Sequence, residues 1–262
     1  YMSLTINHQT NDISNSTGTV KLNGTAVGGD NTPNIWYGSR GVFAGGTING
    51  ARGDVIDYIT IASTGNATDF GDLTVARFAL SGGCSNGTRG VFGSGSQSGT
   101  NNTMDYVTIA STGNATDFGD LTVARSQGPS GASDMTRGLW AGGFTGSNSD
   151  VIEYITIAST GNATDFGNLS AARRAMGACS NGTRATFGGG YISGSSDTID
   201  FVTISTTGNA SDFGNLSLAR SDLASCSSAA GRGVFGGGSI TDSPYVTDLI
   251  DYIYISTTGN AS

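Results

Sequence analysis

The apolar positions of this chain come in short runs that glycine and small polar residues interrupt every few positions. Examples are 55–61 (VIDYITI), 89–93 (RGVFG) and 104–110 (MDYVTIA). Runs rich in Val, Ile, Thr, Tyr and Phe are typical of β-strands, and the frequent glycine argues against helix. The run at 55–61 offers apolar or aromatic residues to both faces, which indicates a sheet covered on both sides. The pattern therefore predicts an all-β protein.

The same runs return at a fixed spacing. Residues 60–77 and 108–125 both have the sequence TIASTGNATDFGDLTVAR, weaker copies occupy 156–173 and 203–220, and a fifth begins at Tyr254 and stops at Ser262. An Arg-Gly-hydrophobic tripeptide and an acidic-aromatic pair each recur about every 48 residues, the length of one four-stranded propeller blade. We expect an all-β β-propeller of four-stranded blades, with five blades in this chain.

One repeat shows where the strands should lie. In the second repeat we expect strands at 79–86, 89–93, 104–110 and 115–123, counted from the centre of the propeller outward. Asp117-Phe118-Gly119 in the outer strand is a predicted bulge.

The domain organisation follows from the period. Residues 1–33 form a polar lead, and residues 34–262 form the propeller, whose last repeat is incomplete. Residues 17–27 loosely resemble the outer-strand sequence, so we expect them to supply the outer strand of the last blade and close the ring. The alternative is a chain that continues beyond Ser262 and adds one or two blades.

Composition narrows the choice of partners. The 262 residues include 43 glycines and carry a net charge of −8, with one lysine, Lys21, and one histidine, His8. An acidic chain without basic clusters is a poor partner for nucleic acid or an anionic membrane. No apolar run approaches the roughly 20 residues needed to span a bilayer. We therefore expect no nucleic-acid binding and no membrane insertion.

The residue types needed for catalysis are scarce. The single His8 lies in the polar lead, and no His/Cys cluster has zinc spacing. We expect no enzyme activity, no metal and no cofactor, although the Asp-Phe-Gly-Asp turns and a ring of arginines leave a bound ion or an acidic ligand as alternatives. Carboxylates and arginines that recur once per blade are interpreted as structural positions, bonded to the backbone or to one another. They are Asp57, Asp105, Glu153, Asp200, Asp251, Arg89, Arg137, Arg184 and Arg232.

Three cysteines, Cys84, Cys179 and Cys226, occupy equivalent places in the predicted inner strands. Cysteines that lie one or more blades apart cannot be assumed to be close enough for a disulfide. We expect small, buried, free thiols.

Two connections in each repeat vary while the others are constant. The first follows the second strand of a blade, and the second follows the arginine at the end of the outer strand. Alternate connections of an up-and-down blade emerge on one face, so we predict a recognition face on scaffold-held loops; neutral drift is the alternative. The candidate ligand-binding residues there are Arg52, Phe78, Gln97, Asn101, Phe144, Asn148, Tyr191, Asp242 and Tyr245.

The repeat unit R-G-V-F-G-(S/G)-G, I-D-Y, D-F-G-D-L, A-R resembles the kelch repeat over about residues 34–262. The matching glycine doublets are Gly45-Gly46, Gly142-Gly143, Gly188-Gly189 and Gly236-Gly237, and the second repeat departs with Gly93-Ser94-Gly95. The usual outer-strand tryptophan of the family is replaced by Phe70, Phe118, Phe166 and Phe213. The resemblance implies a propeller fold and leaves function open.

The Asn/Thr/Gly-rich lead followed by near-identical repeats also resembles, in composition, bacteriophage tail-fibre or virion surface proteins. We therefore expect a non-catalytic binding module at a virion surface or in another extracellular assembly, which attaches to a host cell-surface glycan or protein receptor. The alternatives are a structural or decorating virion subunit and a kelch-type adaptor between proteins. Other subunits of the assembly are expected partners, and a homo-oligomer is left open.

Overall fold

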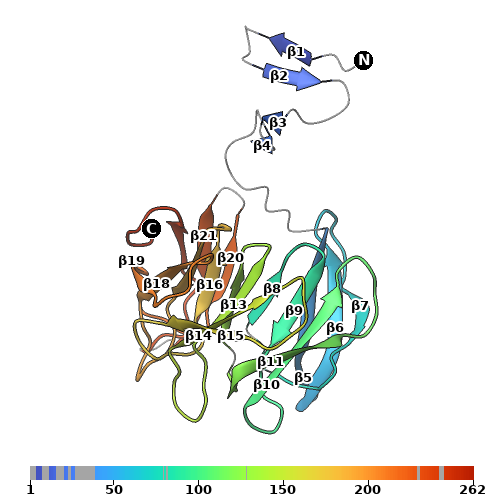
Figure 1. The fold of residues 1–262 in the computed structure, drawn as a ribbon. Coiled ribbons are helices and arrows are strands. Elements are labelled where there is room, and N and C mark those ends of the chain that lie inside the picture. Colours follow the sequence, from blue (N-terminus) through green and yellow to red (C-terminus); the bar gives the residue numbers. More distant parts are fainter. Residues whose placement is uncertain are drawn as a thin grey trace. The chain divides into compact units, whose positions relative to one another are not determined.

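The computed structural model describes residues 39–78, 80, 82–127, 129–228, 231–241 and 245–262, together with the backbone of four short strands nearer the N-terminus (Figure 1). These residues contain no helix, and so none that is long and apolar enough to cross a membrane. The chain divides into two compact units, Tyr1–Asn34 and Ile35–Ser262. In the first unit, two antiparallel pairs form, β1 (Leu4–Asn7) with β2 (Asp12–Asn15) and β3 (Lys21–Leu22) with β4 (Thr25–Ala26).

The second unit consists of five antiparallel sheets in chain order, which we call blades one to five. Blade one contains β5 (Arg40–Ile48), β6 (Ala51–Thr60) and β7 (Thr68–Asp72). Blade two contains β8 (Gly82–Ser85), β9 (Arg89–Gly93), β10 (Asn101–Thr108) and β11 (Thr116–Arg125). Blade three contains β12 (Ser130–Ser133), β13 (Arg137–Ala141), β14 (Val151–Thr156) and β15 (Thr164–Asn168). Blade four contains β16 (Gly177–Ser180), β17 (Arg184–Gly188), β18 (Thr198–Thr203) and β19 (Ser211–Asn215), and blade five contains β20 (Ala224–Ser227), β21 (Arg232–Gly236) and β22 (Ile250–Tyr254).

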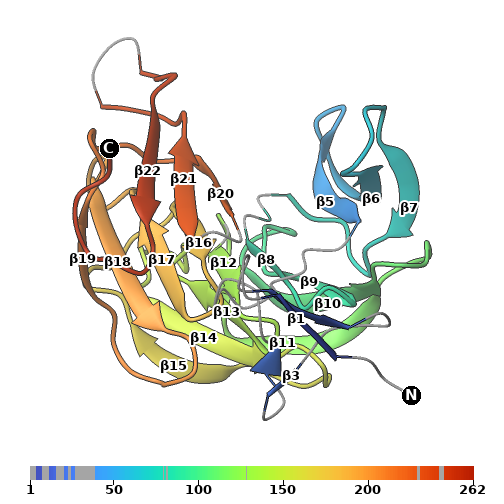
Figure 2. The ribbon, with the colours of Figure 1, turned by 90° about the horizontal axis from the view of Figure 1, so that it is seen from above.

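The sheets are arranged as a five-bladed β-propeller (Figure 2). The first strands β8, β12, β16 and β20 contact one another in sequence, and the later strands of each blade lie progressively outward. The predicted fold class and blade number are confirmed. The three middle blades have four strands, whereas blades one and five have three among the described residues.

The missing strand of blade five is the outer one, which Ser262 only begins, since its N–H donates to the carbonyl of Tyr252 at 3.1 Å. Residues 17–27 were expected to supply this strand. The structure describes only β3 and β4 of that segment, and these pair with each other. The rest of the segment lies outside the described residues, so ring closure by it stays a prediction.

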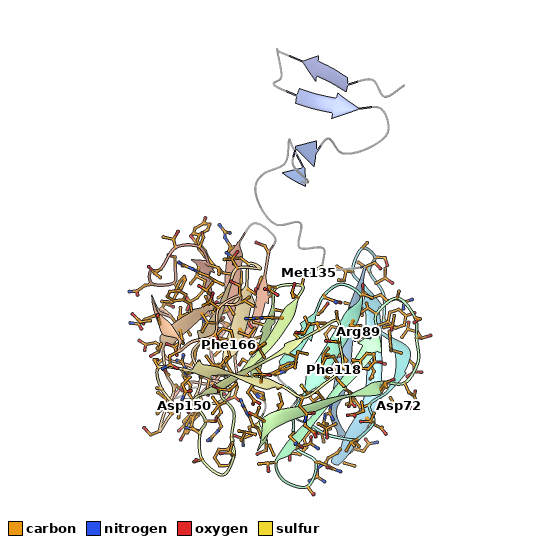
Figure 3. The ribbon with its side chains drawn as sticks, in the orientation of Figure 1. Asp72, Arg89, Phe118, Met135, Asp150 and Phe166 are labelled. Carbon is orange, nitrogen blue, oxygen red and sulfur yellow. The ribbon has the colours of Figure 1, made fainter. Side chains whose placement is uncertain are left out.

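The constant Asp-Phe-Gly stretch forms the predicted bulge. In blade three Ile152 pairs with Gly167 but Glu153 pairs with Asp165, so Phe166 has no partner of its own across the ladder. Phe166 is buried, and its ring packs edge-on against Tyr154 with 6.0 Å between centroids. The same pair recurs in blades one, two and four; Phe118 and Phe166 are labelled in Figure 3.

The constant turn of each blade is fastened to the outer strand of the preceding blade. Gly113 N–H donates to the carbonyl of Phe70 at 2.7 Å, and Ala115 N–H donates to that of Asp72 at 2.8 Å. In return, Asp72 N–H donates to Asn114 Oδ1 at 3.1 Å. The same three bonds recur at the next three junctions. This joint explains why STGNATDFG hardly varies.

A buried ion pair also crosses each of these four junctions. The arginine at the end of one outer-strand segment meets the carboxylate on the third strand of the next blade. The pairs are Arg77–Asp105, Arg173–Asp200 and Arg220–Asp251, each with 2.8 Å between Nη2 and Oδ2, and Arg125–Glu153. Burial lowers the pKa of Arg125 to about 10, so it stays cationic at neutral pH.

The other repeating arginine, on the second strand, also joins each blade to the next one. It lies over the third-strand aromatic ring of its own blade and donates from Nη1 to a carbonyl of the next blade. The bonds run from Arg40 to Ile109 (3.0 Å), Arg89 to Ala158 (2.9 Å), Arg137 to Ile204 (3.0 Å) and Arg184 to Ser256 (3.1 Å). Arg232 of blade five lies over Tyr252 but donates instead to the Tyr254 hydroxyl at 2.9 Å.

Candidate functional site

In blades two to five, the two variable connections lie together. The segment that enters a blade forms an antiparallel bridge with the segment that follows the second strand of that blade. The bridges are Phe78 with Ser96, Ser126 with Phe144, Arg174 with Tyr191 and Ser221 with Ser239. We call the surface made by these two sets of connections the variable-loop face. Most of the sequence differences between repeats are therefore gathered on one side of the blades.

Arg174 is the centre of a cluster on this face. Its guanidinium lies over the rings of Tyr191 and Phe144, 4.6 and 5.0 Å from their centroids. Its Nη1 donates to Asn148 Oδ1 at 2.8 Å, and Asn148 Nδ2 donates to the carbonyls of Tyr191 (3.1 Å) and Ile192 (2.6 Å). The contacts hold an aromatic ring, a guanidinium and an amide in place before any ligand arrives, which lowers the entropic cost of binding.

An open pocket of about 830 Å³ lies beside this cluster. Arg174, Tyr191, the carboxylate of Asp222 and several serine and threonine hydroxyls line it, together with apolar Leu223 and Ile240. A concave site of this size with an apolar platform and a few polar groups is the usual form of a small-ligand site. Rings, hydroxyls and planar polar groups are also the chemistry that recognises sugars.

The backbone beside the pocket is strained. Ala175 and Asp222, which both line it, have φ values of 56° and 54°. Non-glycine residues rarely adopt this left-handed region, and such strain clusters at ligand sites. The equivalent residue Gln127, which also lines the pocket, has a φ of 48°. The entering segments are thus held in one conformation by their surroundings.

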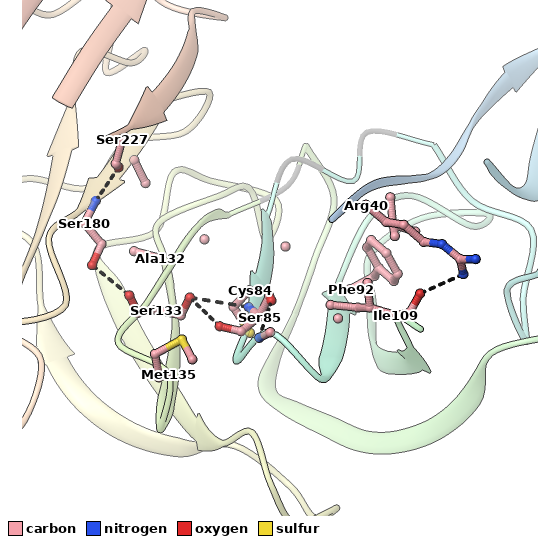
Figure 4. A pocket seen from close by; sticks show the side chains of 16 residues that line it. Arg40, Cys84, Ser85, Phe92, Ile109, Ala132, Ser133, Met135, Ser180 and Ser227 are labelled. Atoms are coloured by element: carbon pink, nitrogen blue, oxygen red, sulfur yellow. Dashed lines mark hydrogen bonds between the residues drawn. The ribbon is translucent and has the colours of Figure 1, made fainter. Parts of the chain in front are cut away.

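A second cavity, of about 360 Å³, lies along the first strands of the blades (Figure 4). Four serines on these strands contribute to its lining. Ser133 Oγ donates to the carbonyl of Ser85 at 3.1 Å, Ser180 Oγ donates to that of Ser133 at 2.7 Å, and Ser227 Oγ accepts from Ser180 N–H at 2.8 Å. These hydroxyls join neighbouring blades, so the larger pocket is the better candidate site.

The predicted ligand-binding residues are distributed unevenly. Phe144, Asn148 and Tyr191 belong to the Arg174 cluster. Arg52 of blade one lies over Phe78 at the entrance to blade two, 5.7 Å from the ring centroid, and neither residue lines the larger pocket. Tyr245 is 66% exposed, and Asp242 lies outside the described residues.

Asn101 requires a correction, because it was expected among exposed loop residues. It is 7% exposed, its Nδ2 donates to Gln97 Oε1 at 3.2 Å, and its Oδ1 accepts from Thr103 N–H at 2.6 Å. The physical reason is that β10 begins at Asn101, which pairs with Arg125. Asn101 therefore shapes its own loop, while Gln97 remains exposed.

Arg174 and Asp222 were not among the residues predicted from the sequence. The available signal was the Arg173-Arg174 doublet of the fourth repeat, because the other repeats follow the first arginine with Phe or Ser. Asp222 carried no comparable signal.

The thiols differ in environment. Cys84 and Cys179 are buried, but Cys226 is exposed, so its predicted burial was wrong. Cys84 and Cys179 are covered by the following blade at Gly138 and Gly233, and among the described residues no blade follows blade five. Burial raises the pKa of Cys179 to about 12 and that of Cys84 further.

We expect one thiol per chain to react with an aromatic disulfide reagent in dilute native protein at pH 8. Only the thiolate reacts, and at that pH the raised pKa values and burial leave Cys84 and Cys179 inert. Absorbance of the released thiolate measures the number of reacting groups. Cys226→Ser should abolish the fast phase, and two or three fast equivalents in the unsubstituted chain would contradict the structure.

Within the described ranges, no group of three or more His, Cys, Asp or Glu side chains is placed to hold a metal ion. No protein-family model matches the chain, and no curated protein matches it in sequence.

Proposed function

We propose that the chain is a non-catalytic binding module whose variable-loop face recognises a cell-surface glycan. The observation that carries this proposal is the preformed cluster of Arg174, Tyr191 and Asn148 at the edge of an open pocket. The ring supplies an apolar platform for a sugar face, and the guanidinium, carboxylate and hydroxyl groups supply donors and acceptors for its hydroxyls. A protein receptor is the alternative ligand for the same face.

We further propose that the propeller is kelch-like and belongs to a virion surface or another extracellular assembly. The kelch-like assignment is supported by a pair of adjacent glycines after the second strand with positive φ, such as Gly142 at 70° and Gly143 at 105°. Only glycine adopts such angles readily. The virion setting is supported by the compositional resemblance to tail fibres, in which repeated weak contacts gain strength through multivalency.

Glycan-array binding of the full chain tests the proposed ligand class. We expect Tyr191→Ala and Arg174→Ala each to weaken binding by about tenfold or more, the effect of removing a well-packed anchor residue. Tyr245→Ala is the matched control, since it removes an exposed aromatic ring that does not line the pocket. Binding that survives both pocket substitutions would contradict the assignment of the site. Absence of binding to every glycan would favour a structural subunit or a protein receptor.

A further inference from the structure

Blades one and five each present a sheet face that a neighbouring blade covers elsewhere in the propeller. On blade one, Phe43 and Ile61 are both 58% exposed. The equivalents of Phe43 in blades three to five, Trp140, Phe187 and Phe235, are 0% exposed, and those of Ile61, namely Ile109, Ile157, Ile204 and Ile255, are at most 7% exposed. We call this face, with Gly41, Phe43 and Ile61, the leading face.

The complementary surface lies on blade five. Ile250 is 69% exposed, whereas its equivalents Ile56, Met104, Ile152 and Ile199 are 0% exposed. We call this face, with Cys226, Arg232, Gly236 and Ile250, the trailing face. The exposure of both faces shows that blades one and five are not packed against each other (Figure 2).

The first matched contact joins an aromatic ring to a glycine. At an internal junction, Phe235 covers Gly188 so closely that a Cβ on the glycine would lie 2.9 Å from the ring, and Trp140 covers Gly93 in the same way. Beside Gly236 the nearest side-chain atom is Cγ1 of Ile250 in its own blade, at 3.9 Å. Phe43 on the leading face is therefore a ring that covers no glycine of another blade, and Gly236 on the trailing face is a glycine that no ring of another blade covers.

The second matched contact joins a sulfur-bearing side chain to a glycine. A Cβ on Gly138 would lie 2.2 Å from Cys84 Sγ, and one on Gly233 would lie 2.9 Å from Cys179 Cβ. Cys226 on the trailing face is exposed, and the nearest atoms to Gly41 on the leading face all belong to its own blade. These two residues are the unmatched halves of the same contact.

The third matched contact is a hydrogen bond. In the first four blades the repeating arginine donates to the next blade at or beside the isoleucine equivalent to Ile61. Among the described residues Arg232 reaches no such carbonyl and bonds Tyr254 instead. The carbonyl of Ile61, on the leading face, is its structural counterpart.

We propose that the trailing face of one copy of this chain binds the leading face of a second copy, head to tail. Three contacting groups on one face match three on the other. Among the described residues, the two glycine contacts each occur at two internal junctions and the arginine bond occurs at all four. Because the two faces differ, the association is heterologous and produces strings or closed rings of copies rather than a symmetric dimer.

Asp57 sets the strength of this association. Asp57 is equivalent to the carboxylates that form ion pairs with the arginines at the ends of the outer strands. Within the described residues, no arginine forms an ion pair with Asp57. Burying an unpaired carboxylate is unfavourable, so docking against Asp57 should be weakened by its charge. Asp57→Asn is therefore expected to tighten the association about tenfold.

Sedimentation velocity of the full chain, from about 1 µM to about 200 µM, tests the proposal. We expect the chain to form larger species as concentration rises, and Phe43→Asp and Ile250→Asp each to remain monomeric. A mixture of the two variants should form dimers and nothing longer, since each keeps one intact face. Cys226 should lose its thiol reactivity in the associated species.

Both substituted side chains are exposed, so folding should be retained, and circular dichroism checks this. A chain that stays monomeric at every concentration would overturn the proposal and favour closure within one chain or a different partner. A monomeric mixture of the two variants, or self-association of Ile250→Asp alone, would overturn the head-to-tail arrangement.

Discussion

Replacement of Arg173 by methionine should lower the free energy of unfolding by roughly 3–5 kcal/mol, the usual cost of removing one partner from a buried ion pair. Arg173 is buried and donates to Asp200 at 2.8 Å, to the carbonyl of Thr198 at 2.8 Å and to that of Phe187 at 3.2 Å. Methionine fills much of the space but leaves the carboxylate of Asp200 buried without a counter-charge. Chemical denaturation followed by tryptophan fluorescence measures the change.

The double variant Arg173→Met with Asp200→Leu separates charge from packing. Replacing both partners by apolar residues of similar size is often close to neutral, so much of the lost stability should return. The N–H of Ser170, which donates to Asp200 at 3.0 Å, would still lose its acceptor, and recovery should therefore be incomplete. A single variant that costs less than about 1 kcal/mol would show that the pair does not hold the junction.

The propeller could be predicted because the same sequence pattern recurs five times along the chain. Each repeat must bury its own strands against the next, so a period of about 48 residues and short β-branched runs already restrict the architecture. Strand limits were less accurate. The third strand of blade two was expected at 104–110, but β10 runs from Asn101 to Thr108 because the ladder with β11 extends to the pair Asn101–Arg125.

The partners of the repeating charges could not be assigned from the sequence. The first four repeats each contain a carboxylate and two arginines, and their spacing does not reveal that both arginines reach the following blade, Arg77 at the carboxylate of Asp105 and Arg89 at the carbonyl of Ala158. Pairing across blades depends on how sheets twist and pack, which is a property of the assembled propeller.

Residues at equivalent positions of the repeats can also have different surroundings in the structure. Cys226 has the same place in its strand as Cys179, yet it is exposed because a following blade is absent from the described residues. Likewise, Arg174 is important for the candidate site because Phe144, Asn148 and Tyr191 from two other loops surround it. The variable connections pointed to the right surface, but only their convergence identified the central residue.

A substitution next to the constant turn should also have a large effect on stability. Gly119 has a φ of 136°, and a Cβ there would lie 2.5 Å from the carbonyl oxygen of Gly161 in the next blade. We expect Gly119→Ala to lower the free energy of unfolding by about 4 kcal/mol or more, at the severe end for single substitutions, because backbone on both sides must move. Chemical denaturation measures this effect and the extent to which unfolding stays cooperative.

Gly161→Ala is the matched control for this substitution. Gly161 has a similar φ of 153°, but a Cβ there would meet nothing within 4 Å. Its replacement should cost only the backbone strain, about 1–3 kcal/mol. The difference between the two variants therefore measures the close approach of neighbouring blades. Equal losses would mean that left-handed backbone geometry alone keeps glycine in these turns, whereas a larger loss at Gly119 would show that the repeat keeps this glycine because the next blade lies against it.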